Sequence, residues 1–152
     1  MLWHGDTDRI INITLGGEHI EQSRSINILG VNLDEKLNFS LHTRDVCNTV
    51  SKQVGILNRL KNLIPSCAKL QLYKSAIIPH LIYCQLVWHF SGASDWRKLE
   101  RLQEKALRTV FNNTSNTYHT LLQKAKLTTL YNTRLQDILI LRFKVKHGLT
   151  LK

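Results

Sequence analysis

The stretch from about residue 66 to residue 89 is apolar on nearly every side of a helix, and it constrains the fold more than any other feature. One helical face would carry most of its large apolar residues: Leu70, Tyr73, Ile77, Leu81, Cys84 and Trp88. Ile78, Ile82 and Leu86 would cover much of the remaining surface. A helix of this kind is usually buried at the centre of its domain, so the other elements must pack around it. Pro79 predicts a kink, or a division into 66–78 and 80–89, because proline lacks the N–H that a helix interior needs.

Everything after Ser40 predicts helices that could surround this element. Their expected ranges are about 40–63, 95–112, 118–126 and 128–147, with Pro65 ending the first and Gly148 the last. We expect Ser66 and Ser94 to act as N-caps, since a serine oxygen can accept a bond from a free N–H of the first turn. The segment "LRFKVKH" also alternates as a strand would, but the periodic segment before it is too long for a strand, so we favour helix.

Two of these helices carry clear apolar stripes. The stripe of the first consists of Val46, Val50, Val54, Leu57 and Ile64. The stripe of the 95–112 helix consists of Trp96, Leu99, Leu102, Ala106, Leu107 and Val110.

The first forty residues follow a different pattern. Residues 9–15 and 26–33 are rich in β-branched and aliphatic side chains and predict strands. Gly16 and Gly17 predict a hairpin turn, with "EHIEQ" as the return strand. A chain of 152 residues is long enough to bury a core of its own. We therefore expect an α+β fold, with a short β-hairpin and strand lead-in over 1–39 and a mainly α-helical domain over 40–152.

Positive charge is concentrated in the predicted helical part. Residues 1–45 carry 4 basic and 7 acidic side chains, a net charge of −3, whereas residues 46–152 carry 17 basic and 4 acidic, a net charge of +13. On the 95–112 helix, five cations occupy about 100° of the circumference opposite the apolar stripe: Arg97, Lys98, Arg101, Lys105 and Arg108. Lys52 and Arg59 are weaker candidates for the same surface, and Lys61, Lys144 and Lys146 could extend it.

This charge pattern favours a polyanionic partner, most often nucleic acid. Side chains placed in this way can follow a phosphate backbone and gain free energy from counterion release. The alternative is a solvated helix face, which is more common for a charged face by itself. We favour nucleic acid because the face lies within the strongly basic part of the chain. Tyr73, Trp88 and Trp96 could in principle stack on bases, but their positions on apolar faces favour core packing.

The residues do not predict a catalytic or metal site. Asp34 and Glu35 follow an apolar strand, but neighbours on a strand point to opposite faces, and no second strand ends in a carboxylate. We therefore interpret them as a strand end and turn. His80 and Cys84 make half of a zinc site, but Cys84 falls on the apolar face, where cysteine behaves as a small hydrophobe. Three widely spaced cysteines and the absence of a signal-like N-terminus predict a soluble protein in a reducing, intracellular setting.

An ordered set of short motifs resembles a known family. These are "LGVNLD" at 29–34, "LYKSAIIPHLIY" at 72–83, "VW" at 87–88 and "QEKALR" at 103–108. The set is similar to the region after the palm in LINE-type (non-LTR) retrotransposon reverse transcriptases of the Jockey-like kind. The resemblance covers roughly residues 9–149, and the set is specific although each piece alone is weak.

The resemblance implies a fragment of an RNA-directed DNA polymerase without its catalytic part. In that family catalysis rests on a palm with an aspartate and a Tyr-x-Asp-Asp hairpin, and no Asp-Asp pair occurs in this sequence. The chain alone is then expected to be inactive, with no catalytic residue and no metal or other cofactor, because Mg²⁺ would belong to the palm. The lead-in would correspond to the palm edge, and the helices to the thumb and the region beyond it.

The same resemblance implies partners and location. The expected partner is an RNA–DNA or RNA template–primer duplex, with no membrane contact. Its phosphates would be gripped by seven cations: Arg97, Lys98, Arg101, Lys105, Arg108, Lys52 and Arg59. Nucleus and cytoplasm are both expected by resemblance. Two alternatives remain open: a non-catalytic protein-interaction module that meets the palm or another protein through exposed apolar surface, and a decayed retroelement copy without function.

Overall fold

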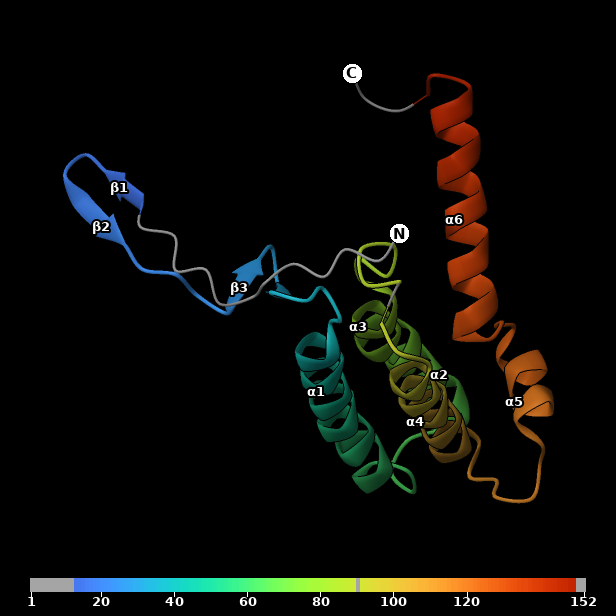
Figure 1. The fold of residues 1–152 in the computed structure, drawn as a ribbon. Coiled ribbons are helices and arrows are strands. Elements are labelled where there is room, and N and C mark those ends of the chain that lie inside the picture. Colours follow the sequence, from blue (N-terminus) through green and yellow to red (C-terminus); the bar gives the residue numbers. More distant parts are fainter. Residues whose placement is uncertain (1–12, 90, 150–152) are drawn as a thin grey trace.

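The computed structural model describes residues 13–89 and 91–149. Four short strands precede a series of helices, in the order shown in Figure 1. The strands are β1 (Ile13–Leu15), β2 (Glu18–Ile20), β3 (Ser25–Ile28) and β4 (Val31–Asp34). The helices are α1 (Ser40–Arg59), α2 (Ser66–Leu72), the π-helix η1 (Tyr73–Ile77), α3 (Ile78–Ile82), α4 (Ala93–Phe111), α5 (Tyr118–Ala125) and α6 (Leu130–Lys146). The predicted α+β class, with a strand lead-in and a helical bundle, is confirmed.

Helices α1 to α4 form a helical body around one core, as the apolar 66–89 stretch requires. Four large residues of that stretch are almost completely buried, namely Tyr73, Ile77, Leu81 and Trp88. The stripes of α1 and α4 close over them, and their buried members are Val50, Val54, Leu57, Leu99, Ala106, Leu107 and Val110. The two stripes therefore bury most of their predicted positions.

The expected division at Pro79, into helices 66–78 and 80–89, is wrong. The helix continues through Pro79, which lies in the first turn of α3, and the irregularity comes before it as the π-helix η1. In this segment the Ile78 N–H bonds to the Tyr73 carbonyl, five residues back. Proline has no N–H to give to the preceding turn, and a local change to wider turns accommodates that loss. The helix then ends at Ile82, and the segment 83–89 consists of turns rather than helix.

The predicted strand over 26–33 forms strand structure but is divided into β3 and β4, because it folds back on itself. Leu29 and Gly30 form a two-residue turn with φ values of 49° and 82°, and β3 pairs with β4 so that Ile28 faces Val31. A turn of this kind needs positive φ at both central residues, which glycine supplies at low cost. The predicted hairpin at Gly16 and Gly17 is confirmed as β1 and β2, with Ile13 opposite Ile20. Residues 9–12 of that expected strand lie outside the described residues.

The expected serine caps do not form. Ser66 is the first residue of α2 and Ser94 lies inside the first turn of α4, where the preceding residues Pro65 and Gly92 take the N-cap positions without a side-chain bond. Side-chain caps occur instead at Thr117 of α5 and Thr129 of α6. The α6 helix matches its predicted range closely but projects away from the helical body, as does the β1–β2 hairpin (Figure 1).

Candidate nucleic-acid interface

Helices α1 and α4 lie side by side and run in the same direction. The cations of one helix are therefore near those of the other. At one end the Ser40 hydroxyl donates to the Asp95 carboxylate at 3.2 Å. At the other end the side-chain amide of Asn112, just after α4, donates to the Lys61 carbonyl, just after α1, at 3.3 Å. Hydrogen bonds thus connect the two helices at both ends. The basic residues of α1 therefore keep a fixed position relative to those of α4.

The five cations predicted on α4 differ in their contacts. Lys98 pairs with Asp95 at 2.8 Å, and this hydrogen bond raises the pKa of Lys98. Arg108 pairs with Glu104 at 2.7 Å and also donates to the Thr114 carbonyl at 2.5 Å. Within the described residues, Arg97, Arg101 and Lys105 are exposed and have no ion pair or side-chain hydrogen bond. These three are therefore the cations of α4 most available to an external anion.

Two hollows on the α1–α4 side bring residues of both helices together. One, of about 450 Å³, brings Lys105 and Arg108 of α4 beside Lys61. Its other lining residues are Asn58, Asn62, Thr109 and the 112–114 loop. The other, of about 470 Å³, places Lys98 near Arg44 and Cys47 of α1. We name the surface formed by Arg44, Lys61, Lys98, Lys105 and Arg108 the α1–α4 basic face.

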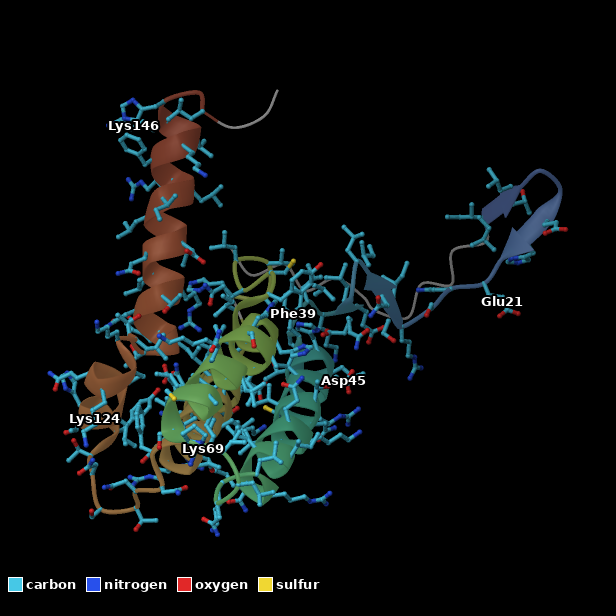
Figure 2. The ribbon with its side chains drawn as sticks, turned by 180° about the vertical axis from the view of Figure 1, so that it is seen from behind. Glu21, Phe39, Asp45, Lys69, Lys124 and Lys146 are labelled. Carbon is cyan, nitrogen blue, oxygen red and sulfur yellow. The ribbon has the colours of Figure 1, made fainter. Side chains whose placement is uncertain are left out.

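The weaker candidates on α1 lie beside this face. Lys52 and Arg59 are exposed. Their positions place them within about 80° of Arg44 on the helix circumference, at about 100° per residue. By contrast, Lys144 and Lys146 lie toward the end of the projecting α6, and Figure 2 shows Lys146 far from the helical body. The structure therefore brings Lys52 and Arg59 toward the basic face but does not bring Lys144 and Lys146 there.

Arg97 and Arg101 face the other side of α4, toward α6. They line a pocket with Trp96, Glu100, Tyr131 and Arg134. The predicted single basic stripe of α4 is thus shared between two surfaces, one facing α1 and one facing the beginning of α6.

The aromatic residues on apolar faces belong to the core, as predicted. Tyr73 and Trp88 are completely buried, and burial raises the pKa of the Tyr73 hydroxyl. Trp88 donates to the Tyr83 carbonyl at 2.9 Å and stacks on Trp96, with ring centroids 4.6 Å apart. These rings are not free to stack on bases.

Asp34 has a structural role. Its two carboxylate oxygens accept backbone N–H groups from Lys36, Asn38 and Phe39 at distances between 2.8 and 3.2 Å. A carboxylate that accepts three N–H groups fixes the turn that leads into α1. The interpretation of Asp34 as a strand end and turn is therefore supported. Within residues 13–89 and 91–149, no three His, Cys, Asp or Glu side chains cluster closely enough to hold a metal ion.

Sequence reasoning missed three cations. Lys69 is 1% exposed, and its Nζ donates to the Lys61 carbonyl at 3.0 Å and to Asn112 Oδ1 at 3.1 Å. Arg134 is buried, and Arg44 lies in the α1–α4 basic face. A signal for the first two was present: Lys69 precedes Tyr73 by four residues and Arg134 follows Leu130 by four, so each shares a face with a core residue.

Comparison with known proteins gives one consistent result. The chain is 30% identical over 101 residues to the RNA-directed DNA polymerase from mobile element jockey of Drosophila melanogaster, which covers 64% of this chain and 11% of that protein. It is 28% identical over 102 residues to the probable RNA-directed DNA polymerase from transposon BS of the same species, and 26% identical over 101 residues to the jockey polymerase of Drosophila funebris, with the same coverage. This chain is related to a region of retrotransposon reverse transcriptases.

The relation has a defined extent. The chain spans about a tenth of the length of the curated relatives it matches. No protein-family profile matches the chain. No solved structure matches it either. In the described part of this reverse-transcriptase-related chain, no helix has the length and apolar character needed to cross a membrane.

Proposed function

We propose that this chain is a non-catalytic, thumb-like part of a retrotransposon reverse transcriptase that binds the primer–template duplex through its phosphates. The α1–α4 basic face carries the proposal, with Lys52 and Arg59 beside it and Arg97 and Arg101 on the other side of α4. The similarity to jockey-type polymerases supports a nucleic-acid partner. The sequence contains no Asp-Asp pair, so we place the polymerisation chemistry outside these residues.

Rigid helices suit this task because phosphate contacts position a protein on a duplex without reading its sequence. A helix of about 20 residues is about 30 Å long, so a row of cations along it can meet several phosphates. The pinning of α1 to α4 at both ends keeps the two rows at one spacing. We therefore expect binding of low sequence specificity and strong salt dependence.

A titration of the purified chain against a labelled RNA–DNA hybrid at several salt concentrations tests this function. We expect log affinity to fall with log salt with a slope of about −3 or steeper, since each neutralised phosphate contributes nearly one unit. Charge reversal at Arg101 and Lys105, two of the three exposed α4 cations without partners in the described structure, should weaken binding by at least tenfold and flatten the slope. The matched control is Lys124→Glu/Lys126→Glu, which reverses two exposed lysines at the end of α5, away from the face. Absence of binding at low salt by folded protein would refute the proposal.

A second function, docking to another protein, is favoured by one specific observation. The projecting part of α6 exposes large apolar side chains, among them Leu139 at 63%, Phe143 at 57% and Val145 at 61% exposure. Exposed apolar surface of this kind marks interaction sites or self-association. Size-exclusion chromatography at low and high salt separates the two functions, because apolar association persists in high salt while bound nucleic acid is released.

A further inference from the structure

Arg134, near the start of α6, is a buried cation that forms no ion pair in the described structure, although the nearby Glu100 carboxylate partly offsets the lowering of its pKa by burial. Its side chain is 5% exposed, and Nε and Nη1 are enclosed with no hydrogen-bond partner among the described residues. Its Cζ lies 3.4 Å from the ring centroid of Trp96 and 5.5 Å from that of Tyr131. The two rings attract the charge but cannot accept its N–H groups in the way an oxygen does. Burial lowers the pKa of Arg134, but a guanidinium titrates so high that it stays charged.

The surrounding pocket is strongly biased toward positive charge. It has a volume of about 370 Å³, and its six lining residues are Trp96, Arg97, Glu100, Arg101, Tyr131 and Arg134. The lining therefore includes three arginines and one glutamate, and the Arg134 guanidinium lies flat on the Trp96 ring. Both oxygens of the Glu100 carboxylate already accept bonds, from the Tyr131 backbone N–H at 2.9 Å and from the Tyr118 hydroxyl at 2.6 Å.

Trp96, which lines the pocket, has a second buried donor that lacks an acceptor. The indole Nε1 of Trp96 is buried without a hydrogen-bond partner among the described residues, next to the unpaired nitrogens of Arg134. Buried donors are almost always paired in folded proteins, so a group of unpaired donors beside a pocket indicates a missing acceptor. The missing acceptor should be an anion with several oxygens, since guanidinium groups bind such anions through paired N–H bonds.

We propose that this pocket, the Arg134 pocket, is a phosphate site that takes one phosphate group of a bound nucleic-acid strand. Arg97 and Arg101 meet the phosphate from the exposed rim, and Arg134 supplies the buried charge after rotating its side chain toward the phosphate oxygens. The half-exposed Tyr131 ring, at 54% exposure, stands beside the site where an adjacent base could stack. The assignment of a nucleic-acid source rests on the proposed function, whereas the phosphate chemistry rests on the pocket alone.

The test uses the full chain with two probes, inorganic phosphate and the labelled RNA–DNA hybrid. Binding of inorganic phosphate is followed by tryptophan fluorescence, because Trp96 forms a wall of the pocket. We expect saturable quenching or enhancement in the wild type. Arg134→Gln and the double variant Arg97→Gln/Arg101→Gln should each weaken phosphate binding by about tenfold or more, as expected for loss of charge-assisted bonds. Lys124→Gln, which removes one charge on α5, is the control for Arg134→Gln, and Lys124→Gln/Lys126→Gln, which removes two, is the control for the double variant. Both controls should leave phosphate binding unchanged.

The double variant keeps the test decisive if Arg134→Gln fails to fold, because Arg97 and Arg101 are exposed. If the hybrid also binds more weakly in both variants, the phosphate comes from a nucleic-acid strand. A second outcome is that phosphate binding depends on Arg134 but the wild type does not bind the hybrid. The site then takes a free phosphate ligand, and both the nucleic-acid source and the proposed function are overturned. If the hybrid binds with a steep salt slope but folded wild-type protein shows no response to millimolar phosphate, the pocket is overturned and the proposed function stands.

Discussion

Helices α4 and α6 are similar in length and both contain many apolar and basic residues, yet one is embedded in the helical body and the other projects from it (Figure 1). In α4 the apolar residues form a single stripe, and four of them are completely buried. In α6 the apolar residues are spread around the helix, and Leu130 and Arg134 are its only buried residues in the described structure. The difference shows that the arrangement of apolar residues, more than their number, decides whether a helix of this chain finds a partner.

The largest expected effect compares one leucine from each helix. Leu107→Ala in α4 should lower the free energy of unfolding by about 3 kcal/mol, because it removes a completely buried side chain and leaves a cavity. Leu139→Ala in α6 should change it by less than about 0.5 kcal/mol, since that side chain is 63% exposed. Urea unfolding measures both. Equal losses would mean that α6 packs against the body in solution, and the contrast between the helices would disappear.

The next effect concerns Lys69, whose position Figure 2 marks within the helical body. Its ammonium group holds the ends of α1 and α4 together through the Lys61 carbonyl and the Asn112 side chain. Lys69→Met should cost about 2 kcal/mol of stability, because hydrogen bonds to a buried charge are lost and their acceptors stay buried. It should also weaken hybrid binding, because the end of α1 near Lys61 would no longer be held beside α4. The control is Lys124→Met, which removes an exposed charge. A stability as high as that of the wild type would show that the methionine packs well and that the ammonium is dispensable.

Local periodicity explains why much of the fold was predictable. The α4 stripe, the range of α6 and the β1–β2 hairpin each follow from patterns within about twenty residues, on which sequence reasoning is strongest. The two-residue turn at Leu29 and Gly30 was missed because apolar residues continue on both sides, and a lone glycine was its only signal. The predicted serine caps were wrong because the N-cap positions fall one or two residues earlier, at Pro65 and Gly92, which offer no side-chain acceptor.

The candidate site was predictable only in part, for a different physical reason. The five cations of α4 could be placed on one face from spacing alone. Their separation between the α1–α4 basic face and the Arg134 pocket depends on which helices pack beside α4, and no local pattern specifies that. The pair of Arg108 with Glu104 follows from their spacing of four residues, whereas the position of Asp95 beside Lys98 also depends on Ser40 across the helix interface.

A smaller effect tests how the two helices begin. Thr129 caps α6 by accepting the Asn132 N–H at 3.1 Å, whereas Ser94 makes no capping bond at the start of α4. Thr129→Ala should therefore cost about 1 kcal/mol, and helicity measured by circular dichroism should fall as the first turn of α6 frays. Ser94→Ala should have almost no effect on either quantity. A loss at Ser94 comparable to that at Thr129 would restore the serine cap predicted from the sequence.

The smallest expected effect is a pH dependence at the junction between α1 and the β3–β4 hairpin. His42 is buried, its Nδ1 accepts the Asn32 N–H at 3.4 Å, and its ring meets Trp88 edge to face. Burial lowers the pKa of His42 below its ordinary value of 6.5, although the nearby Asp45 carboxylate opposes this. The unfolded chain therefore takes up a proton first as pH falls, so stability is full above pH 6.5 and declines below it.

His42→Gln removes this titration while keeping an acceptor for Asn32. Its unfolding free energy should fall less than that of the wild type between about pH 7.5 and about pH 5.5. His89, whose pKa is also lowered by burial, contributes equally to both proteins and cancels in the difference. The neighbouring titratable groups, Asp45, His80 and Tyr83, line the same hollow and stay unchanged. Identical pH profiles would mean that the hairpin releases His42 to solvent, and the β3–β4 hairpin would then resemble the projecting β1–β2 hairpin rather than the helical body.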